Sequence, residues 1–140
     1  MGNRKKIAAN NLKNHKKQVF FAILKNAPVS PKKAVLVADL IRGLEVTKAL
    51  AVLDNLNKSM SIFYYNLLKS SVANYRAKTN LNGENLRVSK VHVCQGMTLK
   101  RIQPAPQGRA HRILKRYSHI RIEVSEMQAV ANVEPQSQIV

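Results

Sequence analysis

Basic side chains dominate residues 86–124, where the only acidic residue is Glu123. Lysine and arginine at this density neutralise phosphate groups, and the counterions that a polyanion releases make such binding steeply dependent on salt. The chemistry available to these residues is therefore ionic binding of a nucleic-acid backbone. The nine bases are Arg87, Lys90, Lys100, Arg101, Arg109, Arg112, Lys115, Arg116 and Arg121.

Residue types that could support catalysis or metal binding are sparse. His92 and Cys94 lie two residues apart on an expected strand, so they share a face, as two metal ligands could. Nothing nearby completes a four-ligand set, and no third group orients a Cys–His pair for nucleophilic catalysis. The carboxylates are scattered, and no glycine-rich phosphate loop is present. We therefore expect no catalytic residue, no metal, no cofactor and no small-molecule substrate, and we expect the protein not to be an enzyme.

The charge balance constrains the partner more than the fold. The chain of 140 residues carries a net charge of +17 and is 45% hydrophobic. That hydrophobic share predicts a small folded core, whereas the charge favours an anionic partner: DNA, RNA or an anionic membrane surface. No acid precedes Asp39 and no base follows Ser125, so the positive charge lies mainly outside the expected core. No apolar run approaches the roughly 18 residues needed to span a bilayer.

Apolar spacing predicts three helices. The first begins at Ser30, which can cap free amides, has Pro31 at its first helical position and stops before Gly43. The second covers residues 46–56, and the third, capped by Ser59, extends to about residue 78. The side chains expected to be buried are Val35, Leu36, Ala38, Leu40 and Ile41 in the first helix, Val46, Leu50, Leu53 and Leu56 in the second, and Tyr64, Leu68, Val72 and Tyr75 in the third.

The remaining elements are predicted to be strands. Residues 19–24 form one strand, and residues 86–124 form two long strands joined by a turn at 104–108, with a bulge near Ser89. Ile120, Ile122 and Val124 alternate with polar residues, which predicts that the base of this hairpin joins the core sheet. Towards the turn, bases replace apolar residues, so the outer part should leave the domain. At about 3.3 Å per residue the arms would reach roughly 50–60 Å.

A hairpin of this kind needs a partner, because two strands alone are marginally stable in water. Its bases recur on both faces, so phosphates are expected on both sides of it. Lys32 and Lys33 follow the predicted helix start and have two interpretations that the residues leave open. They are either solvated charges, or they join free backbone amides in binding a phosphate. The predicted fold class is α+β: three helices packed on a small antiparallel sheet, with a long protruding β-hairpin.

Four segments, residues 30–43, 48–53, 67–74 and 99–124, resemble the L-twenty-two family of large-subunit ribosomal proteins in their order and spacing. The last segment is the most specific: a base precedes Gly108 and Arg109, and after nine further residues His119 is followed by alternating aliphatic residues. The resemblance covers about residues 19–125. It implies a non-enzymatic RNA-binding domain with an extended hairpin at residues 86–124. Residues 1–18 and 126–140 lie outside the family core, and their composition predicts a basic extension that orders on a partner and a flexible tail.

The resemblance also implies roles for individual residues. The hairpin would thread through ribosomal RNA so that its tip lines the polypeptide exit tunnel. The tip would consist of Pro104, Ala105, Pro106, Gln107 and Gly108. The residues implied to contact RNA are Lys32, Lys33, Lys100, Arg101, Arg109, Arg112, Lys115, Arg116 and His119.

The tip departs from the family pattern, which usually has a basic and a small residue where this chain has Ala105 and Pro106. The tip is therefore less charged and stiffer. The expected partners are large-subunit ribosomal RNA, neighbouring ribosomal proteins and the nascent polypeptide, without a membrane. The expected location is a bacterial cytoplasmic ribosome. The alternative is an architectural DNA-binding protein whose β-ribbon arm inserts Pro104 or Pro106 between base steps. A membrane-surface protein would need an amphipathic helix with bulky apolar anchors, which the sequence lacks.

Overall fold

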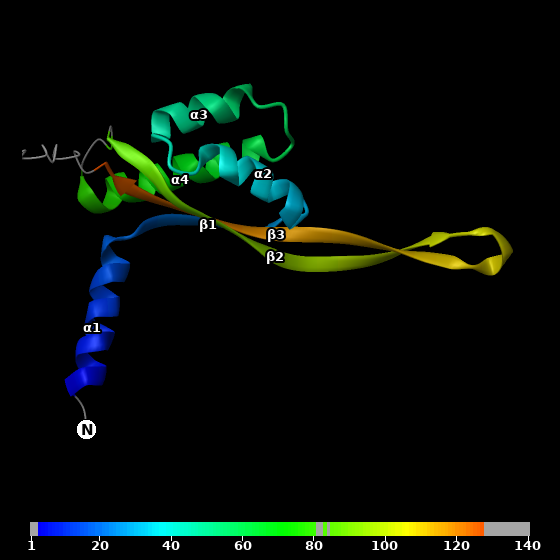
Figure 1. The fold of residues 1–140 in the computed structure, drawn as a ribbon, viewed down its shortest axis with the longest axis horizontal. Coiled ribbons are helices and arrows are strands. Elements are labelled where there is room, and N and C mark those ends of the chain that lie inside the picture. The colour runs from blue at the N-terminus through cyan, green and yellow to red at the C-terminus, as the bar shows by residue number, and fades with distance from the viewer. Residues whose placement is uncertain (1–2, 81–82, 84, 128–140) are drawn as a thin grey trace, which may run out of the picture.

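The computed structural model describes residues 3–80, 83 and 85–127. Three strands form an antiparallel sheet in the order β1-β3-β2. Helices α2, α3 and α4 lie on one side of this sheet, and the β2–β3 hairpin extends far beyond them (Figure 1). The predicted α+β class is confirmed. The elements are α1 (Asn3–Gln18), β1 (Phe20–Ala27), α2 (Pro31–Ile41), α3 (Val46–Asn55), α4 (Ser61–Thr79), β2 (Leu86–Pro104), a 3₁₀ turn (Pro106–Gly108) and β3 (Ala110–Glu126).

The core lies between the helices and the base of the hairpin. β1 pairs with β3 from Phe20 opposite Val124 to Ala27 opposite Ser118, so the predicted joining of the hairpin to the core sheet is confirmed. Alternate residues of β3 point towards the helices and are fully buried, as strand geometry requires. We call the sheet face under α2, α3 and α4 the covered face and the opposite face the open face. Buried residues of the covered face include Ala22, Leu86, Val88, Val91, Ser118, Ile120, Ile122 and Val124.

Helix α2 begins at Pro31 as predicted, but its buried face is not the predicted one. Ala34, Val37, Ala38 and Ile41 are buried at i, i+3, i+4 and i+7. The prediction that Val35, Leu36 and Leu40 are buried is wrong, since their exposed fractions are 37%, 67% and 50%. Two alanines on the buried face permit close packing of α2 on the sheet. Ser30 is the N-cap residue, but its side chain makes no capping hydrogen bond.

Helices α3 and α4 complete the layer of helices over the core. α3 buries Val46, Ala49 and Leu53, whereas the predicted core residues Leu50 and Leu56 are only half-buried against it. The N-cap of α4 is Met60, so the prediction of Ser59 is wrong by one residue. Of the predicted stripe on α4, Tyr64, Leu68 and Tyr75 are buried and Val72 is half-buried.

Two buried tyrosines of α4 tie the helix to its neighbours. The Tyr64 hydroxyl donates to the Ala34 carbonyl oxygen at 3.0 Å, and burial raises the pKa of Tyr64. The Tyr75 hydroxyl donates to Oε1 of Glu126 at 2.6 Å, and this bond is the main reason why the pKa of Tyr75 is raised. The second bond fastens the end of β3 to the C-terminal half of α4.

The hairpin contains two bulges, both in β2. The register with β3 shifts between Val88 and Lys90, which confirms the predicted bulge. It shifts again between Gln95 and Thr98, where no bulge was predicted. Each bulge adds one residue to β2, and β3 alternates without interruption. The turn joining the strands has positive φ angles at Gln107 (62°) and Gly108 (72°).

The N-terminal extension forms α1, which lies on the side of the sheet opposite to α2, α3 and α4 (Figure 1). Its described bases, among them Arg4, Lys5, Lys6 and Lys13, are exposed. Apart from Glu126 and Met127, the predicted C-terminal tail falls outside the described residues.

Candidate nucleic-acid interface

The outer part of the hairpin stands free of the domain. We call the hairpin residues beyond the last pair of β1 with β3, residues 96–103 and 109–117, the stem, and residues 104–108 the tip. Every Lys and Arg of the stem is exposed, and so are Ile102 (74%) and Leu114 (40%). The stem and tip form a long two-stranded arm in Figure 1. Apart from the part beside the N-terminus of α2, its side chains therefore have little protein surface to pack on.

The register assigns the stem bases to both faces. Residues paired across an antiparallel ladder share a face. Leu99 pairs with Lys115 and Arg101 with Ile113, whereas Thr98 pairs with Arg116. Because β3 alternates without a bulge, the face of Lys115 continues the open face, and the face of Arg116 continues the covered face. Bases of the stem on the open-face side are Arg101 and Lys115, and those on the covered-face side are Lys100, Arg112 and Arg116.

The tip is a tight turn that Arg109 helps to close. The backbone N–H of Ala105 donates to the Arg109 carbonyl oxygen at 2.8 Å. Gln107 and Gly108 both occupy the left-handed region, which glycine adopts at little cost and glutamine does not. The predicted turn at residues 104–108 is confirmed. The tip itself contains no charged residue, so Arg109 is the charge nearest to it.

At the base of the hairpin, the open face carries polar groups held in fixed positions. Nδ1 of His119 accepts a hydrogen bond from the Asn26 backbone N–H at 3.0 Å. The Arg121 guanidinium lies 4.3 Å from the ring centre of Phe21 and 2.7 Å from Oε1 of Glu123. His119 is one of the predicted site residues, whereas its partner Asn26 was not predicted. The available signal was Asn26, a residue type that tolerates the positive φ of 56° found at the irregular end of β1.

The N-terminus of α2 lies beside the stem. An open cleft of about 540 Å³ is lined by Lys33 from α2 and by Arg101, Lys115 and Arg116 from the stem. A second opening, of about 480 Å³, places Lys32 near Arg116. The structure thus brings together five of the predicted residues, and the positive end of the α2 dipole adds to their field. Lys100, Arg109 and Arg112 line neither opening.

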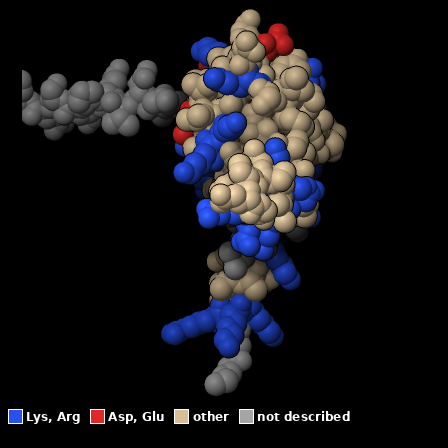
Figure 2. All heavy atoms as spheres, turned by 90° about the vertical axis from the view of Figure 1, so that its right-hand side faces the viewer, with Lys and Arg blue, Asp and Glu red and all other residues tan. Residues whose placement is uncertain are grey.

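Positive charge surrounds the arm when the molecule is viewed from the tip. Figure 2 shows Lys and Arg side chains on several sides of the end that faces the viewer and along the lower extension, with few acidic side chains in sight. Three of the acids already have a basic partner within 3 Å: Asp39 with Arg42, Glu45 with Lys48, and Glu123 with Arg121. The charge that remains without an ion-pair partner is therefore mainly positive.

The residues considered for metal binding are ordinary strand positions. His92 pairs with Arg121 and Cys94 with His119 across the ladder, and both His92 and Cys94 are exposed. Within residues 3–80, 83 and 85–127, no group of three His, Cys, Asp or Glu side chains could hold a metal ion. No helix in this described part of the chain combines the length and the apolar character that crossing a membrane requires.

Comparison with known proteins gives one consistent family. The profile of the family described as ribosomal protein L22p/L17e matches residues 22–125. A protein of Bacteroides fragilis, named large ribosomal subunit protein uL22, is 47% identical over 126 residues, which cover 89% of this chain and 93% of the relative. Proteins of the same name are 47% identical in Porphyromonas gingivalis, over 91% of this chain and 96% of theirs, and 49% identical in Christiangramia forsetii, over 86% and 91%.

Proposed function

Because the chain belongs to the ribosomal protein L22p/L17e family, we propose that its hairpin inserts into folded ribosomal RNA and that its tip lines the polypeptide exit tunnel. The chain is a structural, non-enzymatic protein of the large ribosomal subunit, and its relatives are bacterial. Its partners are ribosomal RNA and other ribosomal proteins, and its location is the cytoplasmic ribosome. We also propose that the chain supports assembly of the subunit and that its tip contacts the nascent polypeptide.

The presence of bases on both faces of the free-standing stem carries this proposal. Ordering the backbone costs about 1–2 kcal/mol per residue, and the stem buries little apolar surface to offset that cost. Phosphates on one side alone would leave half of the stem bases in water. Lys100, Arg112 and Arg116 on one face, with Arg101 and Lys115 on the other, fit RNA that encloses the ribbon.

The proposed contacts follow the positions of the side chains. Lys32 and Lys33 bind phosphate together with the stem at the N-terminus of α2, and His119 offers Nε2 from the open face. The uncharged tip, residues 104–108, meets the nascent polypeptide. The remaining proposed RNA contacts are Lys100, Arg101, Arg109, Arg112, Lys115 and Arg116. We further propose residues 19–125 as one RNA-binding domain, with residues 1–18 as a basic arm.

The test of RNA binding is a comparison of ligands. The purified chain should bind large-subunit RNA more tightly than bent duplex DNA at physiological salt, and it should co-sediment with large subunits from a lysate. Replacing Arg109 and Arg112 with Ala should weaken RNA binding and flatten its salt dependence. A preference for bent duplex DNA would instead support the architectural DNA-binding alternative.

The tunnel position of the tip has its own test. A photo-reactive amino acid at Gln107, in large subunits stalled with a radiolabelled nascent chain, should form an adduct with that chain. The same amino acid at Thr47, an exposed position on α3, is the matched control and should form none. An adduct at Thr47 but not at Gln107 would mean that the tip is not in the tunnel.

A further inference from the structure

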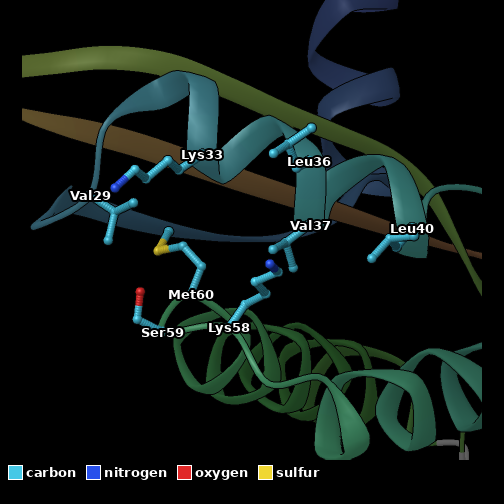
Figure 3. A pocket seen from close by; sticks show the side chains of 8 residues that line it. All are labelled: Val29, Lys33, Leu36, Val37, Leu40, Lys58, Ser59 and Met60. Atoms are coloured by element: carbon cyan, nitrogen blue, oxygen red, sulfur yellow. The ribbon is translucent and has the colours of Figure 1, made fainter.

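An aliphatic groove lies on the domain surface between α2 and the segment that precedes α4. Its volume is about 420 Å³. Leu36, Val37 and Leu40 line it from α2, and Met60 lines it from the start of α4 (Figure 3). Val37 and Met60 form the buried floor, each 2% exposed, whereas Leu36 and Leu40 remain 67% and 50% exposed. The exposed apolar side chains of α2, Leu36 and Leu40, are therefore not covered by any described part of the chain.

Two cations border this floor. Lys33 and Lys58 both line the groove, one from α2 and one from the segment that precedes α4 (Figure 3). Neither amine has an ion pair or a hydrogen bond within residues 3–80, 83 and 85–127. No acidic residue lines the groove. A complementary occupant therefore supplies both aliphatic side chains and a carboxylate.

These features favour a protein segment over RNA. RNA recognition away from phosphates uses stacking of bases on aromatic rings or arginine planes, and the groove contains neither. Aliphatic side chains of a helix or an extended segment, spaced to fall on one face, fill such a groove well. Lys33 also lines the stem cleft, so it lies on the border between the groove and the proposed RNA site.

We propose that this groove binds an amphipathic, carboxylate-bearing segment of a neighbouring large-subunit protein. Aliphatic side chains of that segment cover Leu36, Leu40 and the floor, and a carboxylate pairs with Lys58. The proposal rests on the proposed function, because the partner is a protein of the assembled subunit. The proposal specifies the surface of the chain that the partner protein occupies and the side-chain contacts that hold it there.

The experiment uses large subunits purified from cells that incorporate a photo-reactive phenylalanine derivative at Leu36. Adducts are mapped by mass spectrometry. We expect a cross-link to one peptide of a large-subunit protein that has two aliphatic residues within four positions and an adjacent Asp or Glu. A Lys58→Glu substitution should lower the yield of this adduct about tenfold, which corresponds to roughly 1.4 kcal/mol. Lys69→Glu, an exposed charge reversal on α4 that does not line the groove, should leave the yield unchanged.

A second cross-linking position separates this proposal from the proposed function. The same derivative at Ile102, exposed on the stem, should form adducts with ribosomal RNA. If Ile102 gives RNA adducts while Leu36 gives RNA adducts or none, the proposal of a protein-binding groove is wrong. The proposal of an RNA-binding hairpin is then still supported. A Leu36 adduct that Lys58→Glu leaves unchanged also overturns the carboxylate pairing. Absence of the chain from large subunits overturns both proposals.

Discussion

The backbone N–H of Asn26 donates to Nδ1 of His119 at 3.0 Å, across a sequence separation of 93 residues. Asn26 adopts a left-handed conformation where the pairing of β1 with β3 becomes irregular. The bond makes Nδ1 an acceptor, so in the neutral ring the proton lies on Nε2. The ring also covers Gly96, where a Cβ would lie 3.3 Å from Nε2. His119 is therefore positioned, with Nε2 as a donor, before any partner binds.

The first prediction concerns this proton. In the neutral form of the free protein, ¹⁵N NMR should show His119 as the Nε2–H tautomer, because Nδ1 is occupied as an acceptor. His111 is the control. It is exposed on the stem, and the described residues offer it no hydrogen-bond partner, so it should show a mixture of tautomers. A pattern typical of Nδ1–H at His119 would contradict the hydrogen bond to Asn26.

The second prediction separates the two faces of the stem. Replacing Arg112 and Arg116 with Gln, or Arg101 and Lys115 with Gln, should lower the salt slope of RNA binding by about 0.7–0.9 for each phosphate that is no longer neutralised. Both pairs should have this effect, since RNA is proposed to enclose the ribbon. The slope is measured by titration at several salt concentrations.

The control variant for this comparison lacks two positive charges that lie outside the stem. Replacing Lys58 and Lys69 with Gln changes the net charge by the same amount but should leave the slope nearly unchanged. An effect confined to one stem pair would mean that RNA lies on a single side of the ribbon.

Helix α2 shows why part of the fold could be predicted and part could not. Its beginning at Pro31 is encoded locally, by a residue type that suits the first helical position. Its buried face is not encoded locally, because aliphatic residues occur on both sides of the helix. Large side chains such as Leu36 and Leu40 favoured the wrong side. The correct side is set by how closely α2 approaches the sheet, which Ala34 and Ala38 permit.

The third prediction tests this assignment with neighbouring residues. Ile41→Ala should lower the free energy of unfolding by about 2–5 kcal/mol, because Ile41 is fully buried. Leu40→Ala should lower it far less, since half of that side chain is already exposed. Urea denaturation of both variants measures the difference. Equal decreases would place both side chains in the core and contradict the observed face of α2.

The interface was predictable where it depended on charge, and less so where it depended on register. The bases of the stem and the turn at Gly108 are visible in the sequence. The bulge between Gln95 and Thr98 is not, although Gly96 within a strand was an available signal. This bulge sets which β2 residues share a face with Arg112 and Lys115. The neighbourhood of Lys33 and Arg116 depends on tertiary packing, which no local pattern encodes.

The fourth prediction concerns alkaline stability. Burial raises the pKa of Tyr64 above its ordinary value of about 10. The unfolded state then loses its proton at lower pH than the folded state. The stability contributed by the protonated ring is fully present below pH 10 and is lost as the pH rises further.

The variant that tests this is Tyr64→Phe. At neutral pH it should lose about 1 kcal/mol, because the hydrogen bond to the Ala34 carbonyl is removed. Above pH 10 its stability should fall less steeply than that of the unsubstituted chain, as followed by circular dichroism in urea. Parallel decreases in the two proteins would show that Tyr64 does not contribute to alkaline unfolding.

The stem has a further property that concerns the protein before assembly. β1 covers the edge of β3 only as far as Ser118, so beyond this point both edges of the hairpin expose unpaired backbone groups. Exposed edges invite pairing with another strand and hence aggregation, and charged side chains are a common protection against it. The lysines and arginines of two stems would repel each other in any edge-to-edge alignment. The residues proposed to bind RNA in the assembled particle would therefore also keep newly made copies of the chain apart until RNA neutralises them.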